Sequence, residues 1–188
     1  MHAIRDVRIA ALVAVLGVVA ACSDSNGLPR AGNPNEVDTL SLFALDGTPL
    51  SSPSGYDVAS NLALRTDRAV AFDFAFNIDS AGHAVLLPTG AMGLTRSSGV
   101  QVQSVPFDAV TTAPGGAYVD TMAVPLDSGT VAVVHSRATQ CLSFSAIVFY
   151  YAKIEVLAID TIARRIDLQV LVDQNCGYRG LEPGIPLR

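Results

Sequence analysis

The sequence predicts an all-β domain that folds as a single antiparallel β-sandwich, with a closed β-barrel as the alternative. Half of the 188 residues are hydrophobic, mainly Val, Ala, Leu and Ile, and β-branched residues favour strands. Several segments alternate apolar and polar residues with a period of two, and Gly, Pro, Asn, Asp and Ser bound them. No amphipathic helix, internal repeat or second domain is evident, so we expect one domain over residues 39–188.

Residues 1–21 have the pattern of a secretory signal peptide. Two arginines precede an apolar run, IAALVAVLGVVA, that extends from Ile9 to Ala20. As a helix this run would span roughly 18 Å, well short of the ~30 Å hydrocarbon core of a bilayer. A basic start, a short apolar run and small residues at its end are typical of an export signal rather than of a transmembrane helix.

The end of this run, VAAC, resembles the lipobox of bacterial lipoproteins, with Val19, Ala20 and Ala21 before Cys22. The resemblance implies cleavage before Cys22, a diacylglycerol thioether on its sulfur and an acyl group on the new amino terminus. Two or three acyl chains anchor a protein stably, whereas one holds it only marginally. Ser23, rather than Asp, follows the cysteine, which by the same resemblance implies the outer membrane. The alternative is an ordinary signal peptide with a cysteine near its cleavage site.

Residues 22–38 are expected to form a lipidated, flexible tether. The stretch SDSNGLPRAGNPNEVD is rich in Gly, Pro and Asn and has almost no apolar residues. Such a segment cannot bury enough apolar surface to fold by itself.

The clearest strand of the first half is VAFDFAFNI, residues 70–78. It places Phe72, Phe74 and Phe76 on one face, with Asp73 among the residues of the other. The turn DSAGH and the segment AVLLP follow, which predicts a hairpin. Further along, GVQVQSV alternates, and YVDTMAVPL and TVAVVHS flank DSG as a hairpin-like connection. We interpret the phenylalanine stripe as core, although it is also compatible with a pocket for an apolar ligand.

The C-terminal segments AIVFYYAKIEVLAID and RIDLQVLVD predict a long hairpin that turns at TIAR. The first arm places Lys153 and Glu155 on one face, as expected for a strand with one side in water. Asp167 and Asp173 alternate with apolar residues of the second arm, so we expect these carboxylates to be exposed as well. A helix around residues 151–168 is the local alternative.

Two cysteines, Cys141 and Cys176, remain when Cys22 is lipidated. A pair of cysteines in an exported domain predicts one disulfide, which the chain-entropy model values at roughly 4 kcal/mol. With two histidines, His83 and His135, elsewhere in the domain, these cysteines do not have the spacing of zinc ligands. We therefore expect no metal and no cofactor beyond the lipid on Cys22.

The segment LDSGT around Asp127 resembles the active-site motif of aspartic proteases, in which two such aspartates share a proton. Here Pro125 and Val131 flank it where that family has different residue types. We interpret LDSGT as a tight turn in which Gly129 takes a positive φ. His135 and Ser136 are neighbours in a predicted strand and point to opposite faces, so they cannot act as base and nucleophile.

Near the end of the chain, Tyr178 and Arg179 are candidates for a recognition patch beside the expected disulfide. In the alternative, Tyr178 covers the open end of the long hairpin and Arg179 pairs with an acidic neighbour.

Taken together, these features predict a non-enzymatic lipoprotein of the bacterial envelope, held by lipid at the outer membrane. Its β domain would be a structural or protein-interaction module that contacts another envelope protein or the cell wall. A small-ligand module for apolar or glycan ligands is the alternative, and a hydrolase is a remote third. A net charge of −5 with Lys153 as the only lysine is a poor match for nucleic acid.

Overall fold

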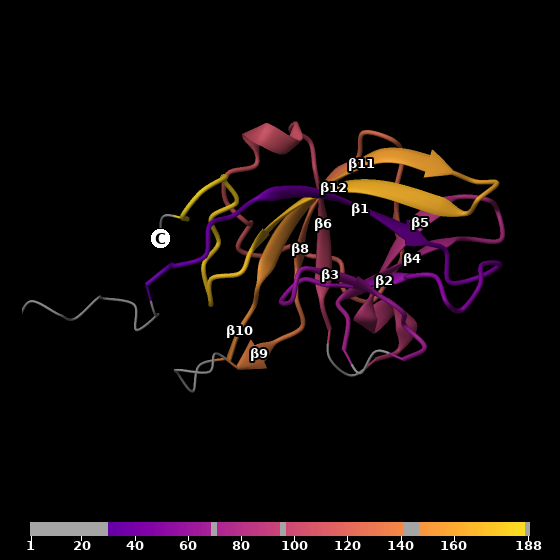
Figure 1. The fold of residues 1–188 in the computed structure, drawn as a ribbon, viewed down its shortest axis with the longest axis horizontal. Helices are drawn as coiled ribbons and strands as arrows, with labels where there is room; N and C mark the ends of the chain where they lie inside the picture. Colours follow the sequence, from indigo (N-terminus) through magenta and orange to yellow (C-terminus); the bar gives the residue numbers. More distant parts are fainter. Residues whose placement is uncertain (1–29, 69–70, 95–96, 141–146, 187–188) are drawn as a thin grey trace, which may run out of the picture.

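The chain folds as two antiparallel β-sheets of five strands each, in a computed structural model that describes residues 30–68, 71–94, 97–140 and 147–186 (Figure 1). The first sheet contains, in spatial order, β1 (Val37–Phe43), β12 (Arg165–Asp173), β11 (Tyr151–Asp160), β8 (Val131–His135) and β6 (Gly99–Gln103). The second contains β3 (Leu62–Leu64), β2 (Gly55–Asp57), β4 (Phe74–Ile78), β5 (Ala84–Pro88) and β7 (Val124–Pro125). Short strands β9 (Thr139–Gln140) and β10 (Ile147–Val148) pair separately. The sheets are not closed into a barrel, so the sandwich prediction is confirmed.

One hydrophobic core draws residues from both sheets. Phe74 and Phe76 of β4 are fully buried in it, together with Leu42 of β1 and Ile154 of β11. Phe72 is buried as well. The phenylalanine stripe is therefore buried, and Phe74 and Phe76 belong to the core.

Two of the predicted hairpins are present. β4 and β5 pair from Phe74↔Pro88 to Ile78↔Ala84, and the backbone N–H groups of Ala81 and His83 close the turn on Asp79 Oδ1. β11 and β12 pair along their length, with a bulge between Val156 and Ala158. The helical alternative around residues 151–168 is therefore wrong.

The LDSGT segment is a turn, as predicted, but it does not join a hairpin. The Thr130 N–H donates to the Asp127 carbonyl at 3.0 Å, the Asp127 N–H donates to Thr130 Oγ1 at 3.0 Å, and Gly129 has φ = 83°. β7 before the turn belongs to the second sheet and β8 after it to the first. The turn thus carries the chain from one layer of the sandwich to the other.

The outer face of the first sheet carries a second, smaller apolar cluster. The 3₁₀ turn η3 (Phe107–Ala109) and its flanks place Phe107 and Val110 against this face, where they join Val133 and Leu171. Lys153 lies on the same face and is only 2% exposed. The expected wet face of β11 is therefore wrong at Lys153, because the segment after β6 folds back over it.

The N-terminal end of the described chain is bound to the domain. The N–H groups of Gly32 and Asn33 donate to Asn175 Oδ1 at 2.9 and 3.0 Å, and the backbone of Asn35 pairs in both directions with that of Gly184. From Gly32 onward, the segment that the sequence assigns to the tether therefore has hydrogen-bond partners in the C-terminal loop. Residues 1–29, with Cys22, lie outside the described chain.

The long axis of the molecule has two distinct ends. Figure 1 shows the segment that leads into β1 near the C-terminal residues, and the turn between β11 and β12 at the opposite end. Ile162 in that turn is 96% exposed. None of the helices in the described part of the chain is long and apolar enough to span a membrane.

Candidate functional site

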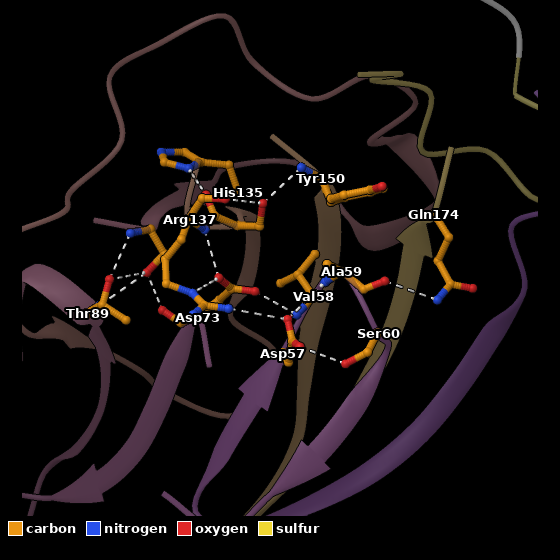
Figure 2. A network of polar contacts seen from close by, with 12 residues as sticks. Asp57, Val58, Ala59, Ser60, Asp73, Thr89, His135, Arg137, Tyr150 and Gln174 are labelled. Atoms are coloured by element: carbon orange, nitrogen blue, oxygen red, sulfur yellow. Dashed lines mark hydrogen bonds and ion pairs between the residues drawn. The ribbon is translucent and has the colours of Figure 1, made fainter. Parts of the chain in front are cut away.

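A buried carboxylate, Asp73, is the centre of the polar network in Figure 2. Its side chain is 0% exposed. Asp73 Oδ1 accepts hydrogen bonds from the backbone N–H and from Nε of Arg137, at 2.7 and 2.8 Å, and Oδ2 accepts one from the Val58 N–H at 2.7 Å. Both oxygens are therefore occupied by donors of the protein itself.

This network joins the two layers of the sandwich. Arg137 follows β8 of the first sheet, whereas Asp73 precedes β4 and Asp57 ends β2, both of the second. Arg137 also lies near Asp57, with 3.6 Å between Nη2 and Oδ1. Burial raises the pKa of Asp73, while the hydrogen bonds and charge of Arg137 act in the opposite direction. Because the carboxylate is enclosed and fully bonded, it serves to hold the sheets together.

Hydroxyl groups extend the network on both sides of Asp73. Ser98 Oγ donates to the Asp73 carbonyl, and the Ser98 N–H donates to Oγ1 of Thr89 in the 3₁₀ turn η2 (Thr89–Met92) at 2.9 Å. Ser136 Oγ donates to the Arg137 carbonyl at 2.8 Å and accepts from the Tyr150 N–H at 2.9 Å. The Ser136 hydroxyl is thus used to fix the backbone after β8.

A cluster of rings, which we call the aromatic shelf, lies on the outer face of the first sheet and consists of Tyr118, His135, Phe149 and Tyr151. Strand register places His135 of β8 directly beside Tyr151 of β11. The His135 ring meets Tyr118 and Phe149 edge to face, with centroid distances of 4.6 and 4.7 Å. All four side chains are half-buried, so each ring keeps part of its surface in solvent.

Two features fix the His135 ring in the aromatic shelf. Nδ1 lies 2.8 Å from the Ser136 carbonyl, which can only accept, so Nδ1 carries the proton. On β6, Gly99 is the residue opposite His135, and a Cβ at that position would lie 2.4 Å from His135 Nε2 and 2.7 Å from Tyr118 Cβ. Only glycine allows the ring to lie this close to the neighbouring strand.

We expect the free energy of unfolding to decrease as the pH falls below about 6.5, in part because of His135. Burial lowers the pKa of His135 in the folded chain. As the pH falls, the unfolded chain therefore takes up a proton on His135 before the folded chain does. The contribution of His135 to the free energy of unfolding is present above the ordinary pKa of histidine and is lost below it. Urea unfolding between about pH 5 and 8 measures the slope. His135→Gln should flatten this slope relative to the unchanged chain, and an unchanged slope would contradict the prediction.

The two residues of the predicted recognition patch, Tyr178 and Arg179, differ in their exposure to solvent. Tyr178 is 4% exposed, and its hydroxyl accepts a hydrogen bond from the Ala31 N–H at 3.1 Å. A buried tyrosine cannot belong to an exposed patch, so that part of the prediction is wrong. Arg179 is exposed, with its guanidinium carbon 6.0 Å from the centre of the Tyr151 ring, and it donates to the Ala113 carbonyl. It therefore lies beside the aromatic shelf.

The single lysine is enclosed in the second cluster. Lys153 Nζ donates to the carbonyls of Phe107 and Val110 at 2.9 and 3.0 Å and lies 4.4 Å from the centre of the Phe107 ring. Burial lowers the pKa of Lys153, and the charges of Asp108 and Glu182 oppose this effect. The ammonium group binds the segment after β6 to the sheet.

Asp173 is also buried, contrary to the exposure expected from alternation. Its Oδ1 accepts from the backbone N–H and Nδ2 of Asn175, at 2.9 and 2.8 Å. Asn175 in turn binds Gly32 and Asn33. Burial raises the pKa of Asp173. Asn175 thus links this carboxylate to the N-terminal segment, and an alternating pattern within β12 does not reveal that contact.

Of the predicted covalent sites, only one cysteine lies in the described chain. Cys176 is buried, whereas Cys22 and Cys141 fall outside the described residues. The disulfide between Cys141 and Cys176 and the lipid on Cys22 therefore stay predictions. Across residues 30–68, 71–94, 97–140 and 147–186, no three His, Cys, Asp or Glu side chains gather in a way that could hold a metal ion.

The described residues also form hollows on the surface. One of about 540 Å³ is lined by Thr112, Glu182 and Ile185, among others, and one of about 410 Å³ is lined by His83, Asp127 and Ile159, among others. Asp127 therefore faces a surface hollow in a turn, next to an exposed histidine.

The sequence matches no protein-family model and no curated protein.

The sequence predicts only part of the aromatic shelf and of the sheet-linking network. It predicts a strand at His135, but the neighbours Tyr118, Phe149 and Tyr151 come from separate segments. One signal could have indicated a covered outer face at β8: the continuous apolar run Val131–Val134 is typical of a strand buried on both sides.

Proposed function

We propose that this chain is an envelope lipoprotein, anchored at the outer membrane through lipid on Cys22, whose β-sandwich is a non-enzymatic structural or interaction module. The VAAC sequence supports the anchor. The module would contact another envelope protein or the cell wall. Because the described chain begins at one end of the sandwich and the β11–β12 turn lies at the other, the anchored domain would present that turn away from the membrane.

One observation carries the non-enzymatic part of the proposal: three buried ionisable or hydroxyl side chains of the described residues are bonded into the scaffold, although Asp173 Oδ2 has no hydrogen-bond partner. Asp73, Ser136 and Lys153 use their polar atoms to hold sheets and loops in place. A catalytic group needs an atom within hydrogen-bond reach of a substrate. Other molecules would therefore contact the surface of the domain. The aromatic shelf on that surface supports a second candidate function, which is the binding of a small ligand or glycan.

Replacing Cys22 with serine is expected to abolish lipid incorporation and to release the protein from membranes. The thioether requires the sulfur, and without acyl chains no strong membrane affinity remains. Fractionation of a Gram-negative host that expresses the full chain, with labelled fatty acid, measures both effects. Ser23→Asp is the matched control: it should keep the lipid but move the protein to the inner membrane. A Cys22→Ser chain that is still trimmed and membrane-bound would contradict the proposal.

The interaction itself can be tested by crosslinking in intact cells. Lys153 is the only lysine and is buried, so amine-reactive reagents are unsuitable and a photoreactive residue is needed. We suggest placing it at exposed Ile162 in the β11–β12 turn and, separately, at Gly116, where an added side chain meets open space. Crosslinks to an envelope protein or to the cell wall would support the module. Their absence at both positions, with a metabolite turned over by the purified protein, would overturn it.

A further inference from the structure

Arg179 is a cation held in place beside the aromatic shelf. Its guanidinium donates to the Ala113 carbonyl, lies over the Tyr151 ring at 6.0 Å, and makes no ion pair with a carboxylate of the described residues. The Arg179 carbonyl accepts from the Ala113 N–H at 2.8 Å, so the backbone is fixed too. In a chain of net charge −5, this position is a local site of positive charge next to half-exposed rings.

The rings beside Arg179 are restrained before any ligand arrives. The Tyr118 hydroxyl donates to the Pro114 carbonyl at 3.0 Å, and His135 is fixed by Ser136 and by its contact with Gly99. Tyr151 lies in a central strand of the sheet between β8 and β12. Side chains that are already ordered lose little conformational entropy on binding, which favours recognition.

The combination of rings and a guanidinium selects a particular ligand chemistry. Aromatic faces attract the slightly positive C–H groups on the apolar face of a pyranose ring, in the same way that they attract the edges of other rings. A guanidinium binds a carboxylate through two parallel hydrogen bonds, which are among the strongest in proteins. A sugar that carries a carboxylate meets both requirements within a single residue.

We propose that the aromatic shelf and Arg179 form a binding site for a carboxylate-bearing pyranose of a cell-wall glycan. This inference rests on the proposed function, since it names the cell wall as the partner of the module. Tyr118 and Tyr151 hold the sugar ring, and Arg179 binds its carboxylate. An acidic peptide would also pair with Arg179, but it would leave the rings without a matching apolar face.

The test is isothermal titration of the full-length lipoprotein in detergent with two matched probes. The first is the disaccharide of N-acetylglucosamine and N-acetylmuramic acid, which carries a lactyl carboxylate. The second is N,N′-diacetylchitobiose, which has similar pyranose rings and no carboxylate. We expect the first to bind roughly tenfold or more tightly than the second, because a hydrogen bond to a charged group is worth at least one factor of ten.

Variants separate the two parts of the site. Arg179→Gln should remove the preference for the carboxylated probe, and Tyr151→Leu should weaken both probes. Arg165→Gln is the control and should keep binding, because Arg165 pairs with Asp167 near the far end of the same outer face. Thermal melting of each variant verifies folding. Equal affinity of both probes, no effect of Arg179→Gln, or tighter binding of an acidic peptide would overturn the inference.

Failure of this inference can be told apart from failure of the proposed function. If neither disaccharide binds but the photoreactive chain crosslinks to an envelope protein, the sugar site is wrong and the interaction module stands. If the disaccharide binds but the Cys22→Ser chain remains in the membrane fraction, the site stands and the lipid anchor is wrong.

Discussion

Replacing Asp73 with alanine is expected to lower the free energy of unfolding by about 3 to 5 kcal/mol. The substitution leaves the Arg137 guanidinium, whose side chain is only 16% exposed, without its main partner. It also removes the acceptor for the backbone N–H groups of Val58 and Arg137. A buried donor left without an acceptor costs roughly 1 to 3 kcal/mol. Because Arg137 follows β8 of the first sheet and Asp73 precedes β4 of the second, the loss weakens the contact between the two layers of the sandwich.

Urea unfolding of the full chain at neutral pH measures this loss. The matched control is Asp67→Ala, which breaks the ion pair of Arg65 and Asp67 at the surface and should cost no more than about 1 kcal/mol. Asp73→Asn, which keeps one acceptor oxygen and the volume, should fall between the two. If Asp73→Ala were no more harmful than Asp67→Ala, the sheet-linking role of the network would be wrong.

The inner face of the sandwich follows directly from the sequence, because one strand is enough to reveal it. Phe72, Phe74 and Phe76 alternate with smaller or polar residues. In a sandwich, a strand that alternates in this way turns its apolar face toward the core. The same holds for the β11–β12 hairpin, where the alternating arm Arg165–Asp173 fixes which side chains enter the core. These elements were predicted correctly because their signal is local.

The burial of three charged side chains could not be predicted in the same way. Asp73 and Lys153 lie between apolar residues and Asp173 follows one, and alternation alone assigns all three to solvent. In the structure Arg137 covers Asp73 and the η3 region covers Lys153, both from distant parts of the chain, and Asp173 bonds to Asn175, which the N-terminal segment also contacts. The segment that covers a strand is determined by how the loops fold back over the sheet. The residue pattern within the strand does not reveal this.

The candidate site depends on the same long-range information. The sequence predicts Arg179 in a recognition patch with its neighbour Tyr178, but the Tyr178 side chain is buried. The actual ring neighbour of Arg179, Tyr151, is on another strand, and strand register brings Tyr151 beside His135. Register follows from the pairing of whole strands, so the shelf became visible only once the sheet was assembled.

Replacing Lys153 with alanine is expected to lower the free energy of unfolding by about 2 to 5 kcal/mol. The lysine stem fills space between the first sheet and Phe107, so its loss leaves a cavity. The carbonyls of Phe107 and Val110 lose their buried donor at the same time. Lys153→Met keeps most of the volume and removes a charge that is costly to bury, so it should cost less than Lys153→Ala. Urea unfolding of both variants measures the difference.

The location of the damage tests the structural role of Lys153 most sharply. Because the ammonium binds the segment after β6 to the sheet, hydrogen exchange in Lys153→Ala should rise first around residues 104–113 and remain slow in the β4–β5 hairpin. Glu155→Ala, on the same face of β11, is the control and should leave exchange in residues 104–113 unchanged. Equal acceleration in both regions would mean that Lys153 contributes to general stability and does not hold this segment. A rise confined to residues 104–113 would establish that the single lysine of the chain is what closes the outer layer of the fold.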